Sequence, residues 1–235
     1  MATEGRAGPV RWAFSDATDG DFRVDPHHGP DARLRGRRRA LTGPIIEDSA
    51  WTALRQVHGS NVVVVDRRGD HDGAEADASV TTSPGAVLSV TTADCAPVLL
   101  YGNDGAAPVV GAVHAGWRGL YDGVLEHTVA AMRSLGATSL TAWLGPCISP
   151  AAYEFGDADL MTLALRFGPD VVGATTSRTP AFDLRAGVRV ALGDVGVELA
   201  QSADDIVCTA TGGAHHSWRA QRTELRQVSV IWIEP

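Results

Sequence analysis

The chain has 235 residues, 44% of them hydrophobic, which is typical of a globular protein with one large domain or two small ones. Its net charge of -8 at pH 7 argues against a protein that binds nucleic acid through general positive charge. No apolar run approaches the roughly 18 residues of a membrane span, and the first residues lack the features of a signal peptide, so we expect a cytoplasmic protein with no membrane partner.

All 20 basic residues are arginine. The absence of lysine excludes Schiff-base catalysis, pyridoxal-phosphate attachment and Walker A phosphate binding, because each needs a lysine amine. The three cysteines, Cys95, Cys147 and Cys208, are an odd number without the spacing of a disulfide framework. In a reducing compartment we expect them to be free thiols, metal ligands or nucleophiles.

The first part of the chain predicts little regular structure. Residues 1–9 are small and polar, and we expect a mobile lead-in to a single domain over residues 10–235. Residues 16–44 are rich in Asp, Gly, Pro and Arg and predict mostly loop, with one short helix around Leu34 to Leu41. Residues 66–76 predict another polar, exposed loop.

Short, β-branched runs bounded by Gly, Pro or Asp predict strands in the rest of the chain. These runs are Val62–Val65, Val87–Thr91, Val98–Tyr101, Val109–Val113, Leu140–Leu144 and Val228–Ile233.

Helices are predicted between some of these runs. One runs from Leu120 to Leu135, with Gly136 as its C-terminal stop, and one from Asp157 to Phe167, with Asp157 as its N-cap. A third covers Arg185 to Leu192 and continues towards Val195. Because strands and helices do not alternate strictly, we expect an α+β fold, a single domain with mixed β-sheets flanked by helices.

Three candidate metal-binding side chains lie at or near the ends of the predicted strands. His58 precedes the first run, Cys95 separates two runs and His114 ends another. Two imidazoles and a thiolate are a competent zinc ligand set, and three protein ligands leave a fourth position open, as in a catalytic site. Copper would accept the same ligands. Their separations in the sequence form no local metal motif.

The same residues allow other interpretations. Cys95 could be a nucleophile with His58 or His114 as its base, or simply a small buried side chain. Each histidine could be a structural residue, and Asp94 a turn residue or cap.

The segment after His114 is equally open. Trp117 is most simply a packing residue, and Gly116 and Gly119 fit a tight turn from strand to helix. Arg118, together with backbone N–H groups, could bind an anion or be a surface charge.

Four segments occur in the order QVHG (56–59), TADCAPVLLY (92–101), HAGWRG (114–119) and GPCISPAAYEFG (145–156). Together they resemble the signature blocks of the YfiH/DUF152 family, also called the multicopper polyphenol oxidase or laccase-domain family. The resemblance is strong over residues 51–156 and weak elsewhere. It implies a single α+β domain and a metal site of His58, Cys95 and His114.

The resemblance also implies an activity. Members are described as zinc-dependent enzymes that phosphorolyse adenosine, inosine or methylthioadenosine and deaminate adenosine. An older description is copper-dependent oxidation of phenols. We therefore expect Zn²⁺, with Cu²⁺ as the alternative, and small-molecule partners, a purine nucleoside and phosphate. The sequence does not determine the oligomeric state, and a monomer is slightly favoured.

The implied site has a catalytic and a substrate-binding part. The catalytic residues are the three ligands and Asp94, which would transfer protons during deamination. The residues expected to bind substrate or phosphate are Arg38, Gln56, Arg118, Cys147 and Tyr153.

Departures from the family pattern fall on arginine-containing motifs. The N-terminal block, residues 15–20, lacks its arginine, while residues 37–41 retain a block that puts Arg38 at a family arginine. The C-terminal arginine motif is altered to His216–Arg219 and Leu225–Arg226. These changes leave the predicted metal ligands intact and make the substrate uncertain.

Three other functions remain open. A copper phenol oxidase is one, although true laccases use a histidine-rich multicopper cluster. A peptidoglycan-precursor amidase would use Cys95 as nucleophile or zinc ligand. A non-catalytic binding module is the third.

Overall fold

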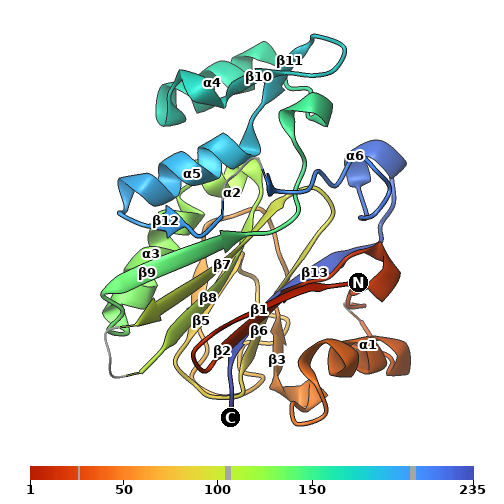
Figure 1. The fold of residues 1–235 in the computed structure, drawn as a ribbon, viewed down its shortest axis with the longest axis vertical. Helices are drawn as coiled ribbons and strands as arrows, with labels where there is room; N and C mark the ends of the chain where they lie inside the picture. The colour runs from red at the N-terminus through yellow and green to blue at the C-terminus, as the bar shows by residue number, and fades with distance from the viewer. Residues whose placement is uncertain (26, 104–106, 202–204) are drawn as a thin grey trace.

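Two β-sheets stack face to face at the centre of the computed structural model, which describes residues 1–25, 27–103, 107–201 and 205–235 (Figure 1). The five-stranded sheet has the order β1-β2-β13-β6-β3. Its strands are β1 (Thr3–Ala7), β2 (Val10–Phe14), β13 (Gln227–Ile233), β6 (Val87–Thr92) and β3 (Trp51–Ala53). All pairs are antiparallel except β3 with β6.

The six-stranded sheet has the order β12-β9-β7-β8-β5-β4. Its strands are β12 (Glu198–Leu199), β9 (Ser139–Leu144), β7 (Ala96–Asn103), β8 (Val109–Ala115), β5 (Ala78–Thr81) and β4 (Val62–Val64). Its two outermost pairs, β12 with β9 and β4 with β5, are parallel, and the inner pairs are antiparallel. Both sheets are therefore mixed.

The space between the sheets is filled by alternate residues of their central strands. Leu88 and Ile231 from the five-stranded sheet pack against Leu99, Val110 and Ala112 from the six-stranded sheet. Successive side chains of a strand point to opposite faces, so the neighbours of these residues face outwards. Those outward residues are also buried, because helices cover both outer faces.

The outer face of the five-stranded sheet is covered by α1 (Ala32–Thr42). Leu34 and Leu41 of α1 pack with Val228 and Val230 of β13. The helix begins at Asp31, whose side chain accepts a hydrogen bond from the backbone of Leu34, a normal N-cap.

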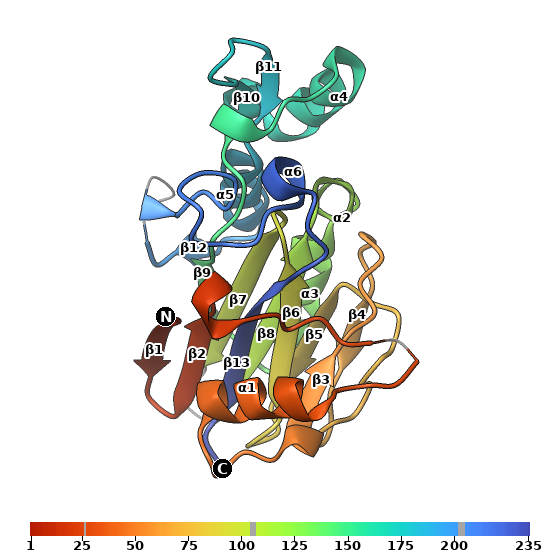
Figure 2. The same cartoon turned by 90° about the vertical axis from the view of Figure 1, so that its right-hand side faces the viewer.

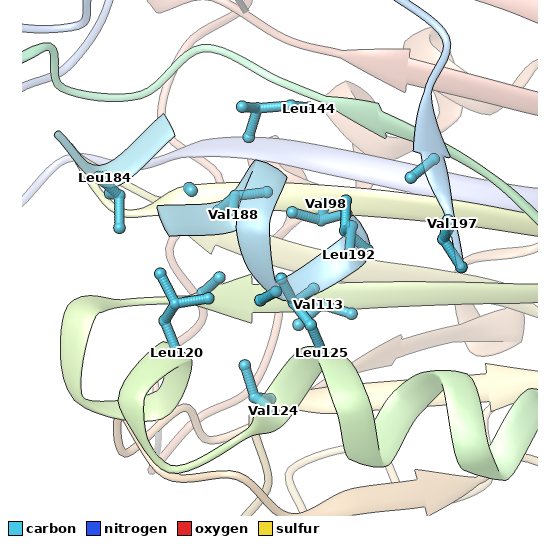
Figure 3. Close-up of a cluster of buried hydrophobic side chains, with 14 of the residues drawn as sticks. Val98, Val113, Leu120, Val124, Leu125, Leu144, Leu184, Val188, Leu192 and Val197 are labelled. Carbon is cyan, nitrogen blue, oxygen red and sulfur yellow. The ribbon is translucent and has the colours of Figure 1, made fainter. Parts of the chain in front are cut away.

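Three helices cover the other sheet: α2 (Trp117–Tyr121), α3 (Val124–Ser134) and α5 (Leu184–Asp194). Figure 3 shows side chains of these helices beside those of the strands, among them Leu120, Leu125, Val188, Val98 and Val113. The order of layers is therefore α1, five-stranded sheet, six-stranded sheet and helices.

The remaining elements lie near one end of the sheets (Figure 2). They are α4 (Asp157–Phe167), the hairpin of β10 (Val172–Ala174) and β11 (Pro180–Phe182), and α6 (Trp218–Gln221). Short 3-10 helices cover Ala17–Asp19, Asp48–Ala50, Pro150–Ala152 and Pro169–Val171. No helix in the described ranges is long and apolar enough to cross a membrane.

The structure confirms the expected α+β fold with mixed sheets and flanking helices. The predicted strands are all present, with ends that differ by up to two residues, and residues 66–76 lack helix and strand. The short helix predicted from Leu34 to Leu41 is present as α1 and is longer than predicted.

Three expectations were wrong. The N-terminal lead-in contains β1, which pairs in full with β2. The helix predicted from Leu120 to Leu135 is two helices, α2 and α3, because Gly123 has φ 89°, which interrupts an α-helix. Helix α4 is capped by Gly156, and Asp157 is its first residue, where its charge still favours the helix dipole.

Candidate metal centre

The three predicted ligands converge at one end of the two sheets. His58 lies in the connection between β3 and β4, and Cys95 in the bend between β6 and β7. Both connections cross from one sheet to the other. His114 is next to the last residue of β8, and the β7–β8 register pairs it with Pro97, two residues from Cys95. The topology therefore brings together residues that are distant in the sequence.

The candidate ligand atoms lie close to one another, and one of their separations matches that around a zinc ion. One atom from each of His58, Cys95 and His114 lies within 4.8 Å of the others, and the Cys95 Sγ is 3.6 Å from His58 Nε2. Tetrahedral zinc with ordinary Zn–N and Zn–S lengths separates its ligand atoms by about 3.3–3.8 Å. In the described part of the chain, this is the group of His, Cys, Asp or Glu side chains that could hold a metal ion.

A fourth residue, Asp77, holds two of the ligands in place. Its fully buried carboxylate lies 2.7 Å from His114 Nδ1 and accepts hydrogen bonds from the backbone N–H groups of Val57, His58 and Gly59. A proton on Nδ1 leaves Nε2 of His114 as the ligating nitrogen. Asp77 was not among the residues predicted from the sequence, although it lies immediately before a buried strand.

Glycines allow the His58 loop to approach β8 and α2 closely. A Cβ atom on Gly116 would lie 2.6 Å from His58 Cδ2, and a Cβ atom on Gly119 would lie 2.5 Å from the carbonyl oxygen of Gly59. The glycines of the HAGWRG segment are therefore required by packing against the ligand loop, as well as by the turn. His58 itself has φ 61°.

The electrostatics favour a thiolate. Burial would raise the pKa of Cys95, but the charge and hydrogen bonds of His114 and His58 outweigh this effect and lower the pKa to about 6. Burial would lower the pKa of His114, but the Cys95 thiolate and the Asp77 carboxylate raise it to about 9. Cys95 is thus in the form that binds metals and reacts as a nucleophile.

The ligands open into a cavity of about 790 Å³. Three aromatic side chains line it: Trp117, Tyr153 and Trp218. Trp117, expected to be a packing residue, has both roles, because its ring packs edge-on against Phe155 at 5.4 Å.

Four arginines also line the cavity: Arg23, Arg118, Arg219 and Arg226. The guanidinium of Arg118 lies 4.5 Å from the centre of the Trp117 ring, and that of Arg219 lies 5.1 Å from the centre of Tyr153. Arg23 is neutralised by Glu224 at 2.6 Å. Across the described ranges, Arg118, Arg219 and Arg226 have no ion-pair partner. The sequence did not predict Arg23, Trp218, Arg219 or Arg226 as cavity residues, although the last three belong to the altered C-terminal motif.

The remaining predicted residues fall into two groups. Gln56, Asp94 and Tyr153 line the cavity. The side-chain amide of Gln56 donates a hydrogen bond to the carbonyl oxygen of Thr91 and accepts one from its N–H, each 2.8 Å long. Gln56 therefore also connects the His58 loop to β6.

Arg38 and Cys147 lie away from the cavity, which corrects the expectation that they bind substrate. Arg38 is on the buried face of α1, where it stacks on Trp51 and pairs with Asp48 at 3.1 Å. Cys147 is fully buried in the core beneath α5, and burial raises its pKa to about 12. Helix and sheet packing bury both side chains, and neither is among the residues that line the cavity.

The family model described as multi-copper polyphenol oxidoreductase laccase matches residues 24–234. A Corynebacterium glutamicum protein named purine nucleoside phosphorylase is 33% identical, over 97% of this chain and 96% of that protein. A Streptomyces griseus protein of the same name is 34% identical over the whole of both chains. The protein named purine nucleoside phosphorylase YfiH from Shigella flexneri is 36% identical over 87% of this chain and 82% of its own length.

Solved structures agree with these sequence relatives. A Neisseria meningitidis protein of the DUF152 family has a TM-score of 0.79 with 26% identity, covering 100% of this chain and 99% of that one. A Bacillus licheniformis YfiH structure, 20% identical, shares the fold with a TM-score of 0.80, covering 96% and 93%. The chain therefore belongs to the multi-copper polyphenol oxidoreductase laccase family, also known as DUF152 or YfiH.

Proposed function

We propose that the protein is a zinc-dependent enzyme that phosphorolyses purine nucleosides and deaminates adenosine. The observation that carries the proposal is a His, Cys and His set opening into a cavity that combines aromatic rings with arginines. The names of the relatives support the same reaction class.

The donor set suits zinc. Two imidazole nitrogens and a thiolate sulfur are normal zinc ligands, and three protein ligands are typical of catalytic sites. Asp77 supplies the outer hydrogen bond that such a histidine ligand usually makes. When bound, zinc would supply a Lewis acid that lowers the pKa of a water or hydroxyl group at its open position.

The cavity offers separate partners for the two substrates. A purine is a flat ring that stacks on aromatic faces, and Trp117, Tyr153 and Trp218 provide them. Phosphate is an anion that arginine forks bind through paired hydrogen bonds, and Arg118, Arg219 and Arg226 are the candidates. In phosphorolysis, a phosphate oxygen bonds to C1′ while the C1′–N9 bond breaks, and the purine leaves with the bonding electrons and takes up a proton.

The experiment separates the possible products. Zinc-loaded protein is incubated with inosine or adenosine, with and without phosphate, and the products are separated by chromatography. Phosphorolysis gives free base and ribose 1-phosphate only with phosphate, whereas deamination converts adenosine to inosine without it. The absence of all these products contradicts the proposal.

A matched pair of variants tests the site. His58 and His71 both have positive φ, 61° and 60°, and both side chains are exposed. Asparagine tolerates this conformation. His58→Asn should lose activity and bound zinc, whereas His71→Asn should keep both. Equal activity in the two variants would exclude His58 as a ligand.

Two observations favour other functions. The family description suggests copper-dependent phenol oxidation, which predicts copper in protein purified without added metal, and oxygen uptake with phenols. The lowered pKa of Cys95 beside two histidines also suits a cysteine hydrolase acting on a peptidoglycan precursor, which predicts activity that survives strong chelation. Zinc in place of copper would exclude the phenol oxidase, and loss of activity on chelation would exclude Cys95 as a metal-independent nucleophile.

A further inference from the structure

We propose that Asp94 is a positioning residue that holds Arg219 in the cavity as an anion-binding side chain, and that it is not the proton carrier expected from the sequence. The inference rests on the proposed function for its substrate, phosphate. Asp94 adjoins the ligand Cys95, and its carboxylate is the contact between the ligand bend and α6.

Both carboxylate oxygens of Asp94 already accept hydrogen bonds from the protein. Oδ2 accepts the backbone N–H of Arg219 at 2.6 Å, and Oδ1 accepts the hydroxyl of Thr209 at 2.7 Å. The backbone carbonyl of Asp94 accepts the N–H of Ile148 at 2.9 Å. These two side-chain contacts join the ligand bend to α6 and to the segment of Thr209, so both oxygens of the carboxylate are already engaged in holding the protein together.

The backbone conformation of Asp94 also indicates a positioning role. Its φ of 107° lies in a region that residues other than glycine rarely adopt. Such a conformation persists when surrounding contacts determine it, and it is concentrated at functional sites. This conformation turns the chain between β6 and β7, so that Cys95 meets the histidines while the Asp94 carboxylate meets α6.

Arg219 is held at both ends. Asp94 fixes its backbone N–H, while its guanidinium lies over the Tyr153 ring and donates one hydrogen bond to the carbonyl of Glu154 at 3.2 Å. A guanidinium has five N–H donors, so the fork retains donors for an anion in the cavity that it lines. Helix α6 is only four residues long, and it depends on such outside contacts to stay in place.

Binding of inorganic phosphate to the zinc-loaded protein, measured by calorimetry, tests the inference directly. Asp94→Asn should weaken phosphate binding about tenfold or more. The carboxylate accepts one hydrogen bond on each oxygen, whereas an asparagine amide has only one oxygen and no charge. Arg219→Ala should also weaken binding. In the Arg219→Ala background, Asp94→Asn should have no further effect, because Asp94 acts through Arg219.

Steady-state kinetics provide a second measurement. As a positioning residue, Asp94 should affect the KM for phosphate, with kcat close to that of the wild type. A fall in kcat that persists in the Arg219→Ala background would instead mean proton transfer by Asp94 and overturn the inference. Asp66→Asn, at an exposed aspartate, is the matched control and should change neither quantity.

The results distinguish failure of this inference from failure of the proposed function. If the wild type cleaves nucleosides with phosphate but Asp94→Asn binds phosphate normally, the inference fails and the proposed function stands. If phosphate binding shows the coupling but no nucleoside reacts, the proposed function fails and the inference stands. An absence of phosphate binding to the wild type overturns the inference.

If Asp94→Asn does not fold, Thr209→Val removes one contact of Asp94 and should weaken phosphate binding by a smaller factor.

Discussion

Gly119 shows how a single residue controls the ligand loop. Its Cα faces the backbone of Gly59, next to His58, and any side chain would contact the Gly59 carbonyl oxygen. A backbone atom cannot move aside like the end of a flexible side chain. The geometry of the candidate metal centre therefore depends on a glycine that is not one of its predicted ligands.

We expect Gly119→Ala to weaken zinc binding by about 10–100-fold, the size of effect seen when the outer support of a metal site is disturbed. Competition with a chromogenic chelator measures it. The control is Gly36→Ala, also within a helix but with no atom within 4 Å of a new Cβ. It should leave zinc binding unchanged and stabilise the fold by about 0.5–1 kcal/mol. Equal zinc affinity in Gly119→Ala and the wild type would contradict this account.

Cysteine reactivity is a second property of individual residues. In metal-free protein, Cys95 should react with iodoacetamide at a rate that rises with pH and levels off above its pKa of about 6, because the thiolate is the reactive form. Cys147, buried and with a pKa of about 12, should not react. Peptide mapping distinguishes Cys95 from Cys208, and zinc should protect Cys95 alone. Labelling of Cys95 that still rises steeply above pH 8 would be inconsistent with a lowered pKa for this thiol.

At the scale of elements, the break between α2 and α3 directs the chain over the six-stranded sheet. The apolar pattern from Leu120 onward suggested one helix because Leu120, Val124 and Leu125 all face the same core. The backbone of Gly123, with φ 89°, interrupts it. Helix periodicity reports which face is buried, but it does not reveal a change of axis within the buried stretch.

Replacing Gly123 should therefore destabilise the fold. Gly123→Ala places a Cβ in the left-handed region, which costs about 1–2 kcal/mol, and urea unfolding measures the loss. Gly193→Ala, in α5 with open space around the new Cβ, should cause no loss. A stabilised Gly123→Ala variant would mean that one continuous helix is compatible with the fold.

For the whole molecule, the two ends of the chain contribute unequally to one sheet (Figure 2). Strand β13 lies between β2 and β6 with all seven residues buried. Strand β1 is at the edge and is mostly exposed. Central strands contribute to both neighbouring ladders and to the core, whereas an edge strand supports only one neighbour.

Deletion of residues 1–8 should leave a cooperative unfolding transition at lower urea concentration. Deletion of residues 227–235 should abolish it, since the core loses Val228, Val230 and Ile231 together. Circular dichroism during urea titration measures both. Cooperative unfolding after loss of β13 would show that the five-stranded sheet is not needed for folding.

The amino-acid sequence was sufficient to predict the fold class, six of the strands and the three residues that converge at the candidate metal centre. Short β-branched runs are local signals, and His58, Cys95 and His114 stand at their ends within motifs that resemble one family. Local pattern was insufficient for the other strands, among them β1, β3 and β5, which are short or poor in large apolar residues.

Only the tertiary structure decided which side chains meet at the site. Asp77 reaches His114 because β5 pairs with β8, and Asp94 reaches Arg219 across 125 positions of sequence. The same packing removed Arg38 and Cys147 from the predicted pocket, since both point into buried layers. Strand register and helix packing are long-range properties, and they determine which residues at different strand ends become neighbours.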